Sequence, residues 1–504
     1  MTPGARLWAA VALFAVLASV YAFSVDLRAS RGAAITGDEP FYLMTTQSLL
    51  QDGDLDLRQQ YDRRSYRAFF DHPDGLWQQS VPTADGRVLS PHDLGLSVLV
   101  LPGFWLGGLR GVQVQLLLLA ALTFTLAYVL SVRLTGAPAA AWAAALGLGV
   151  TATPFVYATE IYPEVPAALV LLAALLRVIP ADGGAPAAGA RTALVPAGAR
   201  AAPVPAGARA PLASTGARAA LVLCVLLSAM VWLGIKYAVP AGLVAGYFWV
   251  HAGRRGRITL LAAGAACAAV YVWFNLNTFG GLTPYAVNVV YAGHSTPEIL
   301  AGHLAFVNRF YRLLGIWIDE RFGVARWAPL VFAALPPLVW LARRPGPGRL
   351  LVGLVAAWLL VATFVAITMM GWWFPGRTLM TVLPLLVVPL TLLIRHGSAV
   401  VRGTVLVLAL WSAAITAALV RAAHAGEVTL AVDPFAMQAP VFQWLAPLVP
   451  NYTNWTAETY ALTALWVLAA AAGFAAAWRA RPGERGEGPW PVHDRSKPAV
   501  WATR

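Results

Sequence analysis

Apolar runs of about 16 to 22 residues recur along this chain from residue 7 to residue 478, and about 20 apolar residues in a helix cross the hydrocarbon core of a bilayer. Hydrophobic residues make up 59% of the 504 residues and charged residues only 12%. Soluble domains average roughly 25% charged residues. The sequence therefore predicts an all-α polytopic membrane protein.

We expect about twelve transmembrane helices, roughly 11 to 13, with a large outer first loop that carries interfacial helices. The run at residues 94–109 is short and contains Pro102, which favours an interfacial or re-entrant helix over a crossing. The expected spans are residues 7–26, 112–132, 137–154, 163–179, 219–235, 237–251, 258–275, 327–342, 350–370, 378–394, 403–420 and 460–478.

Basic residues in the short connectors indicate the orientation. Residues 251–257, 342–349 and 395–402 are rich in arginine, and arginine and lysine accumulate in cytoplasmic connectors of membrane proteins. These connectors lie inside if the N-terminus is cytoplasmic. The net charge of +13 is dispersed over such segments, so it favours a multi-pass plasma (inner) membrane protein and no nucleic-acid partner.

The same assignment divides the chain into four parts. Residues 180–217 are mostly Ala, Pro, Gly and Arg, with the heptapeptide VPAGARA twice, and they predict a disordered cytoplasmic linker. The four expected parts are an N-terminal membrane half (1–179) with an outer loop at 27–111, the linker (180–217), a C-terminal membrane half (218–478) with outer loops at 276–326 and 421–459, and a cytoplasmic tail (479–504).

Two neighbouring carboxylates, Asp38 and Glu39, follow the first apolar run in the stretch ITGDEPFYL. Pro40 comes next, and proline with preceding acids is typical of a helix start, where the dipole favours negative charge. A helix cap is therefore one interpretation. A carboxylate at the membrane surface can also act as a general base.

Other polar groups are expected at the same outer surface, where they would end neighbouring spans. A carboxylate there can deprotonate an acceptor hydroxyl while cations stabilise a leaving phosphate. Snorkelling of Lys236 and interfacial anchoring of Arg377 are the simpler alternatives. The groups are Glu160, Tyr162 and Glu164 in YATEIYPEVP, Lys236 in WLGIKYAVP, and Trp373 and Arg377 in GWWFPGR.

Four stretches together resemble the C superfamily of integral membrane glycosyltransferases, which use polyprenyl-phosphate sugars and include protein O-mannosyltransferases, the lipid A aminoarabinose transferase and actinobacterial cell-envelope transferases. The resemblance lies in TGDEPFYLMTTQSLLQDGDLDL, YATEIYPEVPAALVLL, WLGIKYAVP, and DERFGVARWAPLVFAALPPLVWLARR with GWWFPGRTLMTVLPLL. It implies inverting sugar transfer at the outer membrane face, from a polyprenyl-phosphate sugar to an envelope glycan, lipid or protein acceptor.

The resemblance also implies roles for single residues. Asp38 would be the catalytic base with Glu39 in support, and Lys236 and Arg377 would contact the phosphate of the donor. In SPHDLGLS, His92 and Asp93 stand where such enzymes have a helix that lines a substrate pocket; a loop cap is the alternative. Glu160, Tyr162, Glu164 and Trp373 are further candidates for substrate binding.

A divalent metal near Asp38 stays open, because some members of the family use one and others do not; no other cofactor is expected. The stretch DGDLDL at residues 52–57 resembles the start of a calcium loop. It has Leu57 where such a loop has glycine and Arg63 where it has an acid, so a polar turn is favoured.

Two further expectations can be tested by geometry. Asp319 and Glu320 could bind the acceptor or pair with Arg321 and Arg326, and pairing is the favoured interpretation. The alternative to an enzyme is a transporter or a flippase for lipid-linked sugars, which would have polar residues at the midplane. An enzyme of the proposed kind would bring four ionisable residues into one site: Asp38, Glu164, Lys236 and Arg377.

Overall fold

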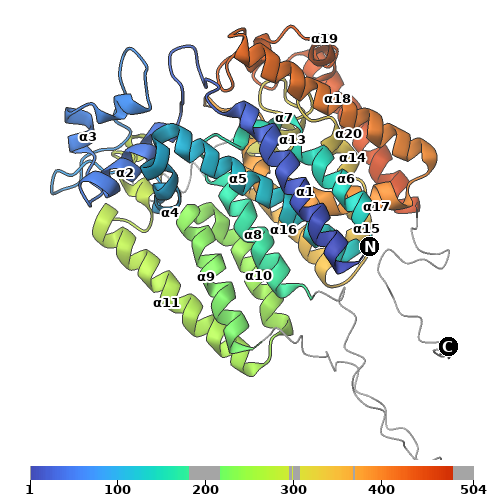
Figure 1. The fold of residues 1–504 in the computed structure, drawn as a ribbon, viewed down its shortest axis with the longest axis horizontal. Helices are drawn as coiled ribbons and strands as arrows, with labels where there is room; N and C mark the ends of the chain where they lie inside the picture. Colours follow the sequence, from blue (N-terminus) through green and yellow to red (C-terminus); the bar gives the residue numbers. More distant parts are fainter. Residues whose placement is uncertain are drawn as a thin grey trace, which may run out of the picture.

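A computed structural model of the chain describes residues 2–180, 216–294, 298, 307–366, 369 and 371–480. Most of the expected linker and nearly all of the expected tail lie outside the described residues. Within the described ranges the secondary structure is helical, apart from one isolated bridge between Ser80 and Asn288. Figure 1 shows the long helices packed side by side, with the first loop at one side of one end.

The first half of the chain contains eight helices. They are α1 (Pro3–Tyr21), α2 (Glu39–Gln51), α3 (Arg58–Asp62), α4 (Leu94–Leu99), α5 (Leu101–Thr135), α6 (Pro138–Gly149), α7 (Ala152–Tyr157) and α8 (Glu164–Val178).

In the second half, the described helices are α9 (Ala217–Leu233), α10 (Ala238–His251), α11 (Arg254–Phe279), α13 (Arg312–Ile318), α14 (Leu330–Ala334), α15 (Leu338–Ala342), α16 (Pro347–Phe364), α17 (Val387–His396), α18 (Ala399–His424), α19 (Pro440–Gln443) and α20 (Ala457–Arg479). Short 3₁₀ turns that matter below are η3 (Ile235–Tyr237), η7 (Arg377–Thr381) and η8 (Leu383–Leu386).

In the described part of the chain, six helical segments are long and apolar enough to cross a membrane: Pro3–Ser24, Leu101–Thr135, Arg254–Val287, Pro347–Phe364, Ala399–His424 and Ala457–Arg479. Each contains most of one expected span, which confirms a polytopic helical membrane protein. The other expected spans coincide with shorter helices or with helices interrupted by proline. Residues 327–342, for example, form α14 and α15, separated by Pro336 and Pro337.

The segment at 94–109 is divided between two helices. Residues 94–99 form α4, and α5 begins next to Pro102. The backbone leaves the helical region at Gly107 and Gly108, where α5 bends. Glycine tolerates the positive φ of +56° at Gly108. The short apolar piece before this bend is therefore distinct from the continuous helix after it.

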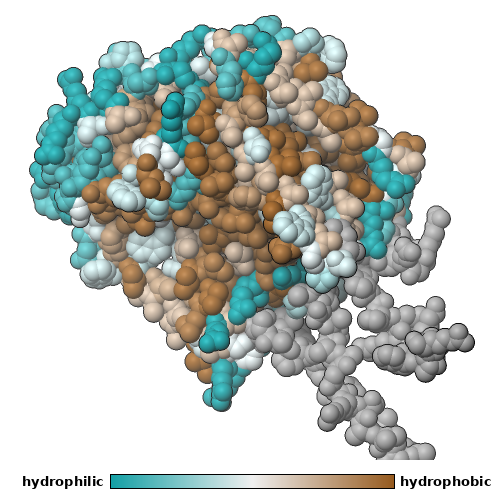
Figure 2. Space-filling model, in the orientation of Figure 1, coloured by the Kyte–Doolittle hydropathy of each residue, from teal (hydrophilic) through white to brown (hydrophobic). Residues whose placement is uncertain are grey.

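The core surrounds α5, which packs against α1, α6, α8 and α17, while α9 packs against α8 and α11. Helices at the periphery bury little of their surface: α20 has only Thr459 and Ala477 buried. Figure 2 shows hydrophobic side chains gathered in a band across the helices, between hydrophilic ends. An apolar surface of this extent is what a helix bundle in lipid exposes.

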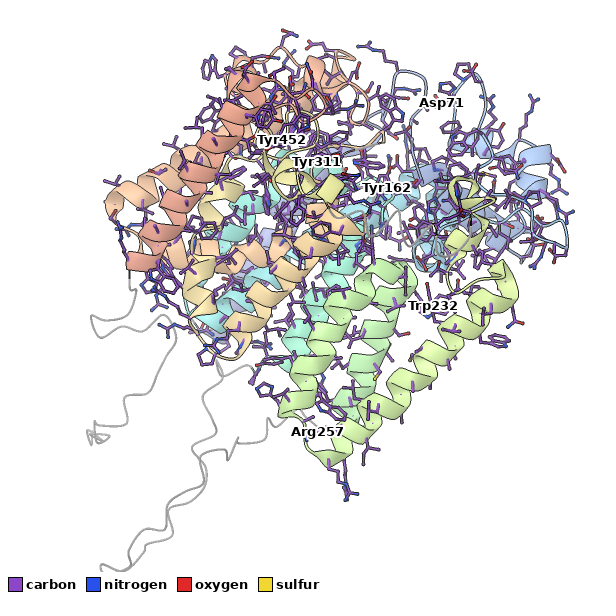
Figure 3. All side chains as sticks on the ribbon, turned by 180° about the vertical axis from the view of Figure 1, so that it is seen from behind. Asp71, Tyr162, Trp232, Arg257, Tyr311 and Tyr452 are labelled. Carbon is purple, nitrogen blue, oxygen red and sulfur yellow. The ribbon has the colours of Figure 1, made fainter. Side chains whose placement is uncertain are left out.

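Polar features lie at opposite ends of the bundle. Figure 3 labels Asp71, from the first loop, at one end and Arg257, from the basic connector between α10 and α11, at the other. Tyr162 lies inside the molecule, nearer the end of Asp71. The acidic first loop and this arginine-rich connector are therefore separated by the apolar band.

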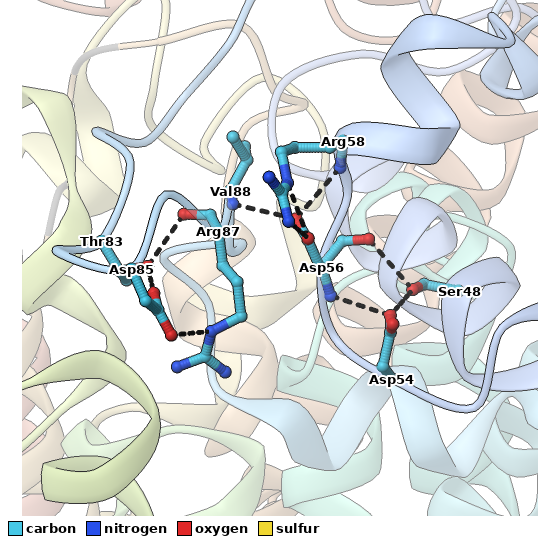
Figure 4. A network of polar contacts seen from close by, with 8 residues as sticks. All are labelled: Ser48, Asp54, Asp56, Arg58, Thr83, Asp85, Arg87 and Val88. Atoms are coloured by element: carbon cyan, nitrogen blue, oxygen red, sulfur yellow. Dashed lines mark hydrogen bonds and ion pairs between the residues drawn. The ribbon is translucent and has the colours of Figure 1, made fainter.

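The acids after α2 organise a turn in the first loop. Asp54 accepts hydrogen bonds from the Ser48 hydroxyl (2.9 Å) and the Asp56 amide (3.0 Å), and Asp56 pairs with Arg58 and accepts from the Val88 amide (3.0 Å) (Figure 4). The carboxylate oxygens of Asp54 and Asp56 therefore accept hydrogen bonds from other groups of the protein. The arrangement agrees with the polar turn favoured by the sequence over a calcium loop.

Candidate functional site

Asp38 is placed at the start of α2 by an unusual backbone conformation. Gly37 has φ of +61°, and a Cβ atom built there would lie 2.8 Å from the hydroxyl of Tyr162. Only glycine fits both conditions easily. The Asp38 side chain makes no capping hydrogen bond to α2. The carboxylate is therefore free for contacts with distant parts of the chain, which counts against the simple cap interpretation.

A connected network joins the four ionisable residues that the enzyme hypothesis required to meet. Arg377 donates from its terminal nitrogen to Asp38 Oδ2 at 3.1 Å and from Nε to Glu164 Oε1 at 3.3 Å. Lys236 Nζ donates to the same Glu164 oxygen at 2.8 Å. Two carboxylates and two cations thus balance in charge. The four come from segments separated by up to 339 residues.

Arg377 is fixed in place by its surroundings. Gly376, directly before it, has φ of +86°, and a Cβ atom there would lie 2.5 Å from Val324 Cγ1. The guanidinium lies 3.8 Å from the centre of the Tyr162 ring and 4.9 Å from that of Trp373. Cations are attracted to aromatic faces. The two aromatic candidates from the sequence therefore position the guanidinium.

His92 joins the network through a residue that sequence reasoning missed. Gln79 Oε1 lies 2.8 Å from His92 Nε2, and Gln79 Nε2 donates to Asp38 Oδ1 at 3.5 Å. His92 Nε2 itself lies 3.8 Å from the same Asp38 oxygen and stacks on Tyr42. A neutral glutamine in a loop carries no charge or motif that would single it out. Its role follows from the fold alone.

Exposure separates the groups that a ligand can reach from those that support them. The side chains of Asp38 and Lys236 are 23% and 21% exposed, whereas Glu164 is 0% exposed. Arg377 and His92 are nearly buried. Asp38 and Lys236 are therefore the most accessible groups of this network, and the buried Glu164 accepts hydrogen bonds from both cations.

The protonation of this region follows from burial and charge. Burial opposes ionisation of Asp38, but His92 and Arg377 outweigh it, and the pKa of Asp38 lies below its ordinary value of 3.8. Burial lowers the pKa of His92 from 6.5, against the effect of Asp38. At neutral pH, Asp38 is consequently a carboxylate and His92 is neutral. Both can accept a proton.

Glu39 faces away from the network and holds the backbone. Its two oxygens accept from the amides of Thr36 (2.8 Å) and Ile161 (2.9 Å), which ties the segment before α2 to the turn before α8. Burial raises the pKa of Glu39 to about 7, although these amides lower it. Glu39 therefore fixes the backbone segment that carries Asp38.

Glu160 is buried, and neither carboxyl oxygen has a hydrogen-bond partner among the described residues. Burial and the neighbouring Glu39 raise its pKa well above 4.5. Glu160 therefore makes no hydrogen bond within the charged network, although Arg377 and Glu164 influence its pKa.

Asp93 links three elements and does not enter the charged network. Its carboxylate accepts from the Tyr271 hydroxyl of α11 at 2.7 Å and from the Ile235 amide at 3.3 Å. Ile235 begins η3, the turn that carries Lys236. Burial raises the pKa of Asp93 to about 6. Asp93 thus positions the turn that presents Lys236.

The residues around Asp38 do not fit a divalent metal. In the described ranges, no group of three or more His, Cys, Asp and Glu side chains could hold one. Asp38 and Glu164 already share the guanidinium of Arg377. Arg377 and Lys236 supply the positive charge beside these two carboxylates.

The expected pairing of Asp319 with arginine is wrong. Its carboxylate accepts from the backbone amides of Arg321 (2.9 Å), Phe322 (2.8 Å) and Tyr452 (2.9 Å). A short acidic side chain often bonds to amides two or three residues on. Asp319 therefore shapes its own turn and ties it to the segment around Tyr452. The Glu320 carboxylate accepts a hydrogen bond from the side-chain nitrogen Nδ2 of Asn451 at 3.1 Å.

Comparisons with known proteins complete the description. No protein-family profile matches the sequence, and no curated protein is significantly similar to it. Crystal structures of ArnT from Cupriavidus metallidurans, bound to undecaprenyl phosphate and in the apo state, are both 15% identical, with TM-scores of 0.45 and 0.47. They cover 93% and 94% of this chain and 76% of their own.

The apo oligosaccharyltransferase of Archaeoglobus fulgidus is 13% identical at a TM-score of 0.42, over 92% of this chain and 56% of that one. Similarity at 13–15% identity concerns the arrangement of helices. The chemistry proposed below is derived from the site.

Proposed function

We propose that this protein is a membrane glycosyltransferase that moves a sugar from a polyprenyl-phosphate donor to an acceptor hydroxyl, with inversion at the anomeric carbon. The observation that carries the proposal is the single network of Asp38, Arg377, Glu164 and Lys236. It places an accessible carboxylate beside two cations at the edge of an apolar bundle. A lipid-linked phosphate needs that combination: cations for its charge, and helices for its tail.

Asp38 would act as the general base. Its carboxylate takes the proton from the acceptor hydroxyl while the acceptor oxygen bonds to the anomeric carbon of the donor sugar. The bond from that carbon to the phosphate oxygen breaks, and its electron pair stays on the phosphate, which leaves with the lipid. Because Asp38 is ionised at neutral pH, it is ready to receive the proton.

Lys236 and Arg377 would stabilise the charge that develops on the leaving phosphate. Their hydrogen bonds to buried Glu164 fix both cations before the substrate arrives. A cation that is already held in position needs little reorganisation energy during the reaction. The more exposed lysine would contact the phosphate most directly. The outer membrane face remains the proposed location of this site, by the charge distribution of the connectors.

The rival proposal, a transporter or flippase, needs polar groups that change partners near the bilayer midplane. The convergence of all four residues in one charge-balanced network supports the enzyme instead.

The test is sugar transfer by purified protein in nanodiscs, with a panel of radiolabelled polyprenyl-phosphate sugars and membrane-derived acceptors. Asp38→Asn should reduce transfer about 10²- to 10⁴-fold, the usual contribution of a general base. The matched control is Asp74→Asn, in the same loop, whose carboxylate is 91% exposed. Full activity of Asp38→Asn would refute the base, and movement of donor across vesicles without product would favour a flippase.

A further inference from the structure

A cavity of about 360 Å³ lies next to the chain segments that lead to Asp38 and Arg377. Its walls come from residues 30–36 and 70–72 of the first loop, from Trp372, and from residues 429–433 after α18. The volume falls within the range of small-molecule sites, about 300–1,000 Å³, and offers room for about one or two sugar units. None of its lining residues belongs to the network described above.

The cavity adjoins both segments that carry the proposed catalytic groups. Thr36 stands two residues before Asp38, and Trp372 stands five residues before Arg377. The two segments touch, because a Cβ atom on Gly37 would lie 3.6 Å from the carbonyl oxygen of Trp372. Thr36 also donates its amide to Glu39 at 2.8 Å. A molecule in the cavity therefore rests on the backbone that presents Asp38.

The aromatic wall of the cavity is held ready for stacking. The Trp372 side chain is 53% exposed, although tryptophan has a large apolar surface to hide. The guanidinium of Arg321 lies 5.1 Å from the centre of its ring. That contact fixes the indole in place. A fixed and accessible indole can pack against the apolar C–H face of a sugar ring.

The polar wall carries balanced charge. Arg31 Nε donates to Asp433 Oδ2 at 3.1 Å, and Asp433 also accepts from the amide of Thr429 at 2.7 Å. His72 also lines the cavity. These groups offer hydrogen-bond donors and acceptors without an excess of positive charge. The cavity therefore suits a neutral polyhydroxyl ligand, whereas an anionic phosphate belongs with Lys236 and Arg377.

We infer that this cavity is the acceptor subsite and that it holds a neutral sugar unit of a glycan. The inference rests on the proposed function and narrows the acceptor from glycan, lipid or protein to a glycan. The donor phosphate lies on the lysine side of Arg377, and the acceptor sugar lies on the Asp38 side. In that arrangement the acceptor hydroxyl reaches the carboxylate from the cavity, opposite the leaving phosphate.

The experiment measures sugar binding in the absence of a donor. Methyl glycosides of mannose, galactose, glucose and arabinose, with their disaccharides, are tested by saturation-transfer NMR against the full chain in nanodiscs. We expect at least one neutral sugar to bind. Trp372→Ala should weaken that binding about tenfold, as loss of an aromatic contact does. Trp372→Phe should restore part of it.

Two further variants separate the cavity from the rest of the surface. Val432→Trp fills the cavity from the opposite wall and should abolish binding. Trp105→Ala removes another exposed tryptophan, outside the cavity, and should leave binding unchanged. Thermal unfolding of each variant shows that it is folded. Equal binding to wild type, Trp372→Ala and Val432→Trp would overturn the inference, and so would the absence of binding by every sugar.

Failure of the inference can be told from failure of the proposed function. Asp38→Asn should still bind the sugars, because the residues that line the cavity are unchanged in this variant. If Asp38→Asn keeps full transfer, the base assignment fails while the cavity is still tested by Trp372→Ala. If transfer to a peptide or a lipid is intact in Val432→Trp, the acceptor class is wrong and the enzyme proposal stands.

Discussion

Replacement of Glu164 by glutamine tests the charge balance of the network most directly. Glu164 is fully buried and accepts from both Lys236 and Arg377. Glutamine keeps nearly the same shape and one acceptor oxygen but removes the charge. The four-residue network then changes from neutral to a net charge of +1, with both cations held in place around a neutral amide.

The expected cost can be worked from the remaining contacts. Removing one partner of a buried ion pair typically costs 3–5 kcal/mol. Here Arg377 keeps Asp38 at 3.1 Å, and Lys236 is 21% exposed, so it regains some hydration. We therefore expect the lower end, about 3 kcal/mol. With an unfolding entropy of roughly 2 cal/mol/K per residue, that lowers the Tm by about 3 °C if the whole chain unfolds together.

The same substitution should strengthen the binding of an anionic lipid. A unit charge removed from near the phosphate changes its binding free energy by on the order of 1–2 kcal/mol. Undecaprenyl phosphate should therefore bind Glu164→Gln about tenfold more tightly than it binds the wild type. Added undecaprenyl phosphate should also raise the Tm of Glu164→Gln more than it raises the Tm of the wild type.

The assay is thermal unfolding in nanodiscs, followed by tryptophan fluorescence with and without undecaprenyl phosphate. The matched control is Glu160→Gln, because Glu160 is also buried in the same turn but has no hydrogen-bond partner among the described residues. The control should change the stability by less than about 1 kcal/mol. Equal stability losses in the two variants, or no gain in lipid affinity for Glu164→Gln, would refute the charge-balance reasoning.

Three further predictions concern the support of the site. Burial raises the pKa of Glu39 from 4.5 to about 7, so between these pH values the folded state holds a proton that the unfolded state releases. The free energy of unfolding should therefore fall by about 3 kcal/mol as the pH rises from about 4.5 to about 7. Glu39→Gln should remove this pH dependence when unfolding is measured across that range. Gly376→Ala should lower stability by about 1–3 kcal/mol, because of its positive φ and the contact with Val324, and should reduce transfer; normal transfer would contradict this. Asp93→Ala leaves the Tyr271 hydroxyl and the Ile235 amide without their acceptor, which loosens η3, the turn that carries Lys236. Steady-state assays should therefore show a higher KM for the donor and little change in kcat.

Much of the site could be predicted because charge is rare in this chain. In a sequence with only 12% charged residues, an ionisable side chain at the end of an apolar run stands out. Asp38, Glu164, Lys236 and Arg377 were identified in this way. Their roles in one network were predicted from their order and from a family resemblance, and their mutual contacts required the structure.

Other members of the site carried weaker signals. Gln79 is a neutral residue in a loop, and nothing in its neighbourhood marks it as the bridge between Asp38 and His92. Gly37 and Gly376 directly precede the proposed base and the arginine, and their positive φ values are visible only in the backbone. A glycine before each functional residue was the available signal, since glycine is the residue that such conformations require.

The sequence by itself determined the class of the protein, because a bilayer imposes a fixed length of apolar helix that is read directly from the chain. It also identified the charged residues next to apolar segments, where burial of a charge is energetically unfavourable and a functional role is expected. Tertiary structure decided which of these residues meet, since contacts such as Asp38 with Arg377 span 339 positions and depend on how the helices pack. It likewise decided that Asp319 bonds to the amides of its own turn, and that a cavity forms next to the segment before Asp38, because a cavity arises only where separate segments come together.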